Sequence, residues 1–225
     1  MQKIDALPDF AEITPSARIE TPAHGWRAKC LQRLVRLDLP VPETVALPAG
    51  TVRAIAAGHP VDVKAILSHF GEAPLISVRP SPQNPDWGGP ATILNIGMNA
   101  ARHAALVQAH GQEAADALYL RFVQSYATHV ARLDPDMFEI RNATAGEGLR
   151  EALRSYEQEM DEPFPDSAER QLSEVLRSMA RAWEGTTARL LRQNLYEVEC
   201  VTDASPEFVN ATLVRADADM IVLEP

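Results

Sequence analysis

The chain has 225 residues, a formal net charge of −10 and 46% hydrophobic residues, which excludes a wholly disordered chain and suits one or two globular domains. No apolar run approaches the ~18 residues of a membrane-spanning helix, and the acidic balance argues against sequence-independent nucleic-acid binding. Cys30 and Cys200 are too few for a disulfide framework or a four-cysteine zinc site, so we expect a cytoplasmic protein with no membrane partner.

The first two segments differ in composition. Residues 1–22 are polar, contain three prolines and no secretory signal, and predict an irregular N-terminal arm. Residues 23–98 alternate short helical and extended patterns, and predict an α/β subdomain. The apolar positions of its first helix recur every three or four residues, as on one helical face: Trp26, Cys30, Leu34 and Leu37.

Two strand candidates within that subdomain are separated by a loop. Residues 75–78 are an apolar, partly β-branched run, and residues 92–97 are a second one. Residues 80–91 between them carry four prolines and two glycines, and therefore predict a loop.

The rest of the chain predicts a helical subdomain and an acidic tail. Residues 99–193 show apolar stripes at helical spacing over 115–130 and 172–183. Asp166, followed three residues later by Glu169, indicates the cap of the last long helix. Residues 194–225 hold one basic residue against seven acidic ones, and their alternating valines suggest β structure that returns to the first sheet. The expected fold class is α+β and helix-rich overall.

The strand–loop–strand stretch is the best candidate for chemistry. Arg79 stands where the first strand enters the loop, and a guanidinium can bind phosphate oxygens through several donors. Gly88 and Gly89 would let backbone N–H groups approach a phosphate closely. The spacing alone favours a plain hairpin with a Pro/Gly loop and a surface arginine, and this alternative stays open.

Several motifs together resemble the N-terminal nucleotide-binding region of pyruvate phosphate dikinase and, more distantly, of phosphoenolpyruvate synthase. The segment from Gly25 to Leu31, the Leu-Asp-Leu-Pro-Val-Pro run at 37–42 and the Arg-Phe-Val-Gln-Ser-Tyr run at 121–126 look like family motifs in the same order. The strongest match is gapless over residues 77–99, at these positions: Ser77, Val78, Arg79, Gly88, Thr92, Leu94, Asn95, Gly97 and Asn99. The likeness covers about residues 24–193.

This resemblance implies a partial ATP-grasp-like subdomain with a helical insertion, kinase-like phosphotransfer chemistry, and ATP with Mg²⁺ as cofactors. The phosphate-binding positions that it implies are Arg27, Arg79, Ser81, Gly88 and Gly89. Phosphoryl transfer depends mostly on positioning and charge stabilisation, for which two cations and a backbone cradle are suited.

The chain also departs from the family pattern. Arg27 replaces a lysine, and Ser81 replaces a glycine and lies between Pro80 and Pro82, which supply no N–H donors. Only 32 residues follow Gln193, where the family continues with a second ATP-grasp half and a phosphohistidine domain. We therefore expect that this chain alone cannot run the full dikinase reaction. It would be a nucleotide-binding protein, a non-catalytic descendant that binds a protein partner or itself, or one subunit of a split phosphotransferase.

Metal sites are poorly indicated. Asp217 and Asp219 would share one face of a strand and could hold Mg²⁺, but an ordinary acidic tail is the alternative. His103 and His110 could share a helical face without the spacing of any known zinc motif, and we expect ordinary surface histidines.

Overall fold

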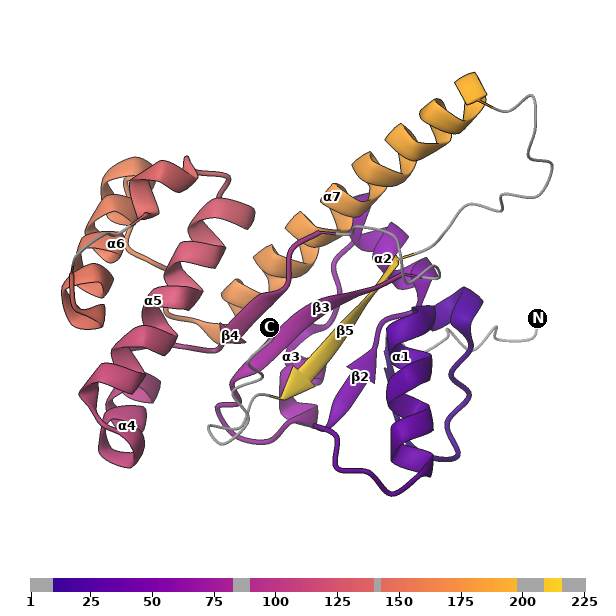
Figure 1. Cartoon of the computed structure of the whole chain (residues 1–225), viewed down its shortest axis with the longest axis horizontal. Helices are drawn as coiled ribbons and strands as arrows, with labels where there is room; N and C mark the ends of the chain where they lie inside the picture. The colour runs from indigo at the N-terminus through magenta and orange to yellow at the C-terminus, as the bar shows by residue number, and fades with distance from the viewer. Residues whose placement is uncertain (1–9, 83–89, 140–142, 198–208, 216–225) are drawn as a thin grey trace.

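The computed structural model describes residues 10–82, 90–139, 143–197 and 209–215 (Figure 1). The elements in chain order are β1 (Ala11–Glu12), α1 (Thr21–Arg36), β2 (Thr44–Ala46), α2 (Ala49–Ala56), α3 (Val63–His69), β3 (Ile76–Pro82), β4 (Ile93–Ile96), α4 (Ala100–His110), α5 (Gln112–His129), the 3₁₀ turn η1 (Pro135–Phe138), α6 (Ala145–Met160), α7 (Ala168–Glu197) and β5 (Val209–Arg215). The fold class is α+β and helix-rich, as expected.

One antiparallel sheet organises the α/β part. Its strand order is β1-β2-β5-β3-β4, so β5, the last strand in the sequence, lies between β2 and β3. Figure 1 shows β5 running through the middle of the sheet, with α4, α5 and α6 gathered beyond the β4 edge. A segment of the acidic tail is therefore a central part of the fold.

Strand β3 extends further than its sequence suggests. The expected loop at 80–91 was wrong at its start, because β3 continues through Pro80, Ser81 and Pro82, which pair with β5 at Ala211, Asn210 and Val209. Pro80 and Pro82 have no N–H group, and because they are two residues apart both donors are missing from the same edge of β3. The other edge of the strand keeps its N–H groups. Pairing with a distant strand overrides the local loop signal.

The two faces of the sheet bury different cores. Val45, Ile76 and Val78 point into the larger core, which also holds apolar residues of α2, α3 and α7. Ala46 points to the opposite face, into a smaller core against Ala28 of α1. This alternation of side chains along a strand places α1 on the face opposite to α2, α3 and α7.

Helix α1 does not bury the face predicted for it. Trp26 and Leu34 are each 37% exposed, and Leu37, just after the helix, is 69% exposed. The buried positions of α1 are His24, Gly25, Ala28 and Gln32. Both sets have helical spacing, so periodicity alone cannot choose between them. Small Ala28 allows close contact with the sheet, and Arg33 lies over the Trp26 ring at 5.4 Å.

The N-terminal arm is partly built into this face. Within residues 1–22, β1 pairs with β2, and Ile13 and Ile19 are buried in the smaller core. The amide of Gln32 donates to the carbonyls of Thr14 and Ala17 at 3.0 and 2.6 Å. The arm is thus held to α1 rather than wholly irregular.

The helical stripes predicted for the second subdomain are confirmed. Phe122, Val123 and Tyr126 of α5 and Leu172 and Trp183 of α7 are all buried. The predicted cap at Asp166 was wrong by one residue, because α7 begins at Ala168 and the hydroxyl of Ser167 accepts from the Arg170 amide at 3.4 Å. Among the described residues, no helix is both long and apolar enough to cross a membrane.

Candidate functional site

Helix α1 is interrupted where it meets strand β3. Gly25 has φ +81° and lies outside helical geometry, so Trp26, Arg27 and Ala28 form the first turn of a new helical segment. A Cβ at Gly25 would lie 1.6 Å from the carbonyl oxygen of Ser81. Glycine is therefore required here both for its conformation and for the close approach of the two backbones.

Ser81 joins the strand to this new helical turn. Its hydroxyl donates to the carbonyl oxygen of His24 at 2.8 Å and accepts from the Ala28 amide at 3.0 Å. It therefore acts as a helix cap supplied by a distant strand. Ser81 is completely buried, so its hydroxyl holds the junction together instead of facing a ligand as the resemblance implied.

This α1–β3 junction, formed by Gly25, Ala28 and Ser81, positions the two arginines of the predicted site. Arg27 directly precedes Ala28 and is half-buried. Arg79 lies two residues before Ser81, hence on the same face of the sheet, and is 6% exposed. The hydrogen bonds of Ser81 thus fix the position of the α1 segment that carries Arg27 relative to the β3 segment that carries Arg79.

Burial controls the charge of the neighbouring histidine. It lowers the pKa of His24, whose Nδ1 accepts from the Glu20 amide at 3.2 Å. His24 is therefore neutral near pH 7. Positive charge at the junction comes from arginines, which remain protonated at any physiological pH.

The other predicted site residues cannot be placed. Gly88 and Gly89 of the loop, and Asp217 and Asp219 of the tail, lie outside the described residues. Within the described ranges, no group of three or more His, Cys, Asp or Glu side chains could hold a metal ion. His103 instead contacts Asp116, with 2.6 Å between Nε2 and Oδ1.

The Asn-Ile-Gly-Met-Asn stretch at 95–99, which begins within β4, has a structural explanation. Asn95 has φ +60° and donates from Nδ2 to the Leu118 carbonyl at 3.2 Å. Gly97 has φ +101°, and a Cβ there would lie 2.3 Å from the Pro74 carbonyl oxygen. Asn99 caps α4 by accepting from the Arg102 amide at 2.9 Å. These motif residues form the turn into the helical subdomain.

Sequence reasoning missed Gln171, which fixes this turn. Its Oε1 accepts from the Gly97 amide at 2.7 Å, and its Nε2 donates to the carbonyls of Met98 and Pro165 at 2.9 and 2.6 Å. The side chain is fully buried. A glutamine beside an apolar stripe was the only signal, and nothing local to α7 indicates partners more than seventy residues away.

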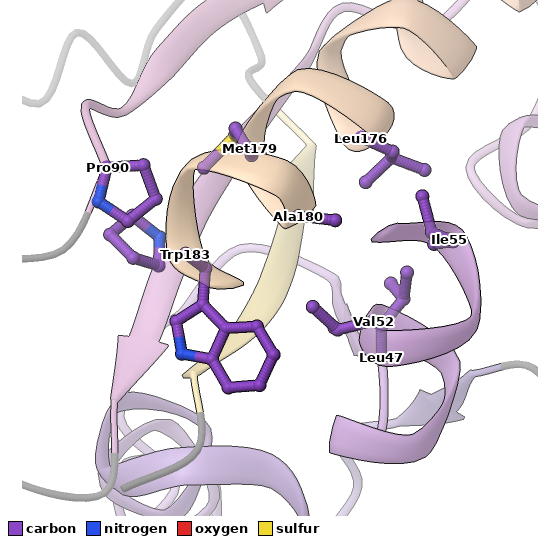
Figure 2. A pocket seen from close by; sticks show the side chains of 9 residues that line it. Leu47, Val52, Ile55, Pro90, Leu176, Met179, Ala180 and Trp183 are labelled. Carbon is purple, nitrogen blue, oxygen red and sulfur yellow. The ribbon is translucent and has the colours of Figure 1, made fainter. Parts of the chain in front are cut away.

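A small cavity on the opposite face of the sheet does not suit a nucleotide. Figure 2 shows Trp183, Met179 and Leu176 of α7 facing Val52 and Ile55 of α2 around it. It holds about 10 Å³, which is about the space of one water molecule, and its lining is apolar. We interpret it as a packing gap in the core.

Comparisons with known protein-family models and with curated proteins find no match to this chain. The likeness to the nucleotide-binding region of pyruvate phosphate dikinase therefore depends on the motifs described above.

Proposed function

We propose that the protein binds the phosphate groups of a nucleotide, with ATP as the first candidate, at the α1–β3 junction. The observation that carries the proposal is the pair of hydrogen bonds made by the Ser81 hydroxyl, one accepted from Ala28 and one donated to His24, which link the segment of Arg27 to that of Arg79. Two forked cations on a rigid support are suited to phosphate oxygens.

The interruption at Gly25 supports the same function. It creates a helix N-terminus beside Arg27, within the sheet face that carries Arg79. A helix N-terminus favours anions because its N–H groups and dipole point outward. The described residues offer no acidic cluster for Mg²⁺, so we assign the metal no role beyond accompanying ATP.

Calorimetry with ATP and Mg²⁺ tests this proposal. We expect wild-type binding, and an affinity lower by about tenfold or more in Arg27→Ala and Arg79→Ala, because each loses charged hydrogen bonds. Arg154→Ala is the control, since Arg154 is exposed on α6. Absence of wild-type binding, or affinities of both variants equal to that of the control, would contradict the proposal. Circular dichroism verifies that the buried Arg79 variant folds.

Catalysis is a separate proposal. The junction supplies charge and position but, among the described residues, no group of three or more His, Cys, Asp or Glu side chains that could hold Mg²⁺. In a split phosphotransferase, a second chain would supply the magnesium ligands.

Binding of another protein chain is the second candidate function. Its specific support is the exposed apolar surface on and after α1, formed by Trp26, Leu34, Leu37 and Leu39. Sedimentation velocity tests the simplest case, self-association. We expect a concentration-dependent dimer that Leu37→Glu abolishes. A wild-type protein that stays monomeric at high concentration would contradict self-association.

A further inference from the structure

A second polar site lies in the helical subdomain, away from the α1–β3 junction. A groove of about 520 Å³ runs between the end of α5, the end of α6 and the first half of α7. A smaller hollow of about 180 Å³ continues it, and Arg132 and Ser178 line both. The groove has the size of small-molecule sites, which span roughly 300–1,000 Å³.

One arginine of the groove is already neutralised. Arg170 pairs with Glu162, with 2.5 Å between Nη2 and Oε1, and with Glu174, with 2.8 Å between Nε and Oε1. Glu174 also accepts a hydrogen bond from the hydroxyl of Tyr126. These two carboxylates, the acidic groups of the lining, are therefore occupied.

Three further arginines of the lining lack such partners. Within the described part of the chain, no ion pair or hydrogen bond engages the guanidinium groups of Arg132, Arg177 and Arg181, and all three residues are exposed. Arg177 and Arg181 are one helical turn apart, about 6 Å along the axis, where like charges repel. Arg132 has φ +64° and approaches from the loop after α5. The lining thus holds four arginines against two glutamates, which gives it a net charge of +2.

The rest of the lining is apolar or neutral. Val130, Ala131 and Met160 offer contacts to an uncharged body, and Ser178 uses its hydroxyl to donate to the His129 carbonyl at 2.8 Å. Guanidinium forks from two directions match the oxygens of linked phosphates better than a single carboxylate. We infer that this groove binds a compact multivalent phosphate, either inorganic pyrophosphate or the diphosphate group of a small organic molecule.

Calorimetry with inorganic pyrophosphate at low salt tests the inference. The variant is Arg177→Gln/Arg181→Gln, and the matched control is Arg150→Gln/Arg154→Gln, an exposed arginine pair at the same spacing on α6. Both doubles change the net charge equally. We expect wild type and control to bind alike, and the groove variant and Arg132→Gln to bind about tenfold more weakly or worse. Equal affinities of groove variant and control, or no wild-type binding, would overturn the inference.

Two more measurements locate the bound pyrophosphate and define the class of ligand. Arg79→Ala damages the proposed nucleotide site but should bind pyrophosphate as wild type does. Loss of pyrophosphate binding in this variant would overturn the assignment to the groove. A hexaglutamate peptide serves as the macromolecular alternative. If it binds through Arg177 and Arg181 while pyrophosphate does not, the groove is a protein-docking surface and the inference is wrong. A methyl diphosphate that binds at least as tightly as pyrophosphate would favour the organic source.

Discussion

At the scale of single residues, the contact between Gly25 and Ser81 determines the shape of the candidate site. The hydroxyl of Ser81 satisfies the Ala28 amide, which the interruption at Gly25 leaves without a helical partner. Because Ser81 is buried, this hydrogen bond is protected from water and its loss would leave a buried donor unpaired. Ser81 thus strengthens the junction structurally.

We predict that Gly25→Ala destabilises the protein far more than Gly58→Ala. Both glycines have positive φ, +81° and +95°, but no atom lies within 4 Å of a Cβ at Gly58. Gly58→Ala should cost about 1 kcal/mol from conformational strain. Gly25→Ala should cost about 3 kcal/mol or more, because the clash with Ser81 adds to that strain. Urea unfolding measures both, and equal costs would contradict the proposed close contact.

At the scale of elements, the helical subdomain is held by an aromatic cluster centred on Phe164. The Phe164 ring meets those of Phe122, Tyr126 and Tyr156 at centroid distances of 5.5, 5.1 and 5.0 Å. Edge contacts of this kind add to the stability that burial of the rings provides. The cluster lies directly behind the arginine groove, since Tyr156 lines both.

Burial in this cluster predicts a loss of stability in alkali. Burial, with smaller contributions from nearby glutamates, raises the pKa of Tyr156 from 10.0 to about 12. The folded state therefore favours the protonated phenol, and the unfolded chain loses its proton first. The contribution is complete below about pH 10 and disappears as the pH rises toward 12, at no more than about 1.4 kcal/mol per pH unit.

Tyr156→Phe should remove this contribution while keeping the ring. We expect the variant to lose less unfolding free energy than wild type between about pH 9 and pH 12. Chemical denaturation across that range measures the difference. Parallel stability–pH curves for the two proteins would refute the prediction.

At the scale of the whole molecule, the central position of β5 makes part of the acidic tail a structural element of the sheet. By composition the tail resembles a terminal extension, but β5 pairs with a strand on each side. Deleting residues 194–225 would therefore split the sheet, and any lost binding would reflect unfolding. A partner contact of the tail must be tested with substitutions that leave β5 intact.

We predict that proline is tolerated at the sheet edge and not in β5. Leu213 pairs with Val45 on one side and Val78 on the other, so Leu213→Pro should cost about 3 kcal/mol by removing a ladder donor. Glu12 in edge strand β1 pairs with β2 alone, and Glu12→Pro should cost much less. Thermal unfolding compares them, and a similar loss in both variants would argue against a central β5.

Local pattern in the sequence was sufficient for several elements. The stripes of α5 and α7 and the strands at 76–78 and 93–96 follow from periodicity and residue type, because each buries an apolar face. Arg27 and Arg79 were found as candidate residues from motifs alone. The charge of the tail and the helix-rich α+β class were also readable from composition and pattern.

Only the tertiary structure determined which residues of distant segments contact one another. It shows that α1 buries Ala28 instead of Trp26, that β3 continues through its prolines, and that Ser81 caps a helix rather than facing a ligand. It also brings Arg132 to Arg177 and Arg181, which no motif connects. Each outcome depends on a partner distant in the chain. Local propensity is worth less than about 1 kcal/mol per residue, and burial or pairing with such a partner readily exceeds it.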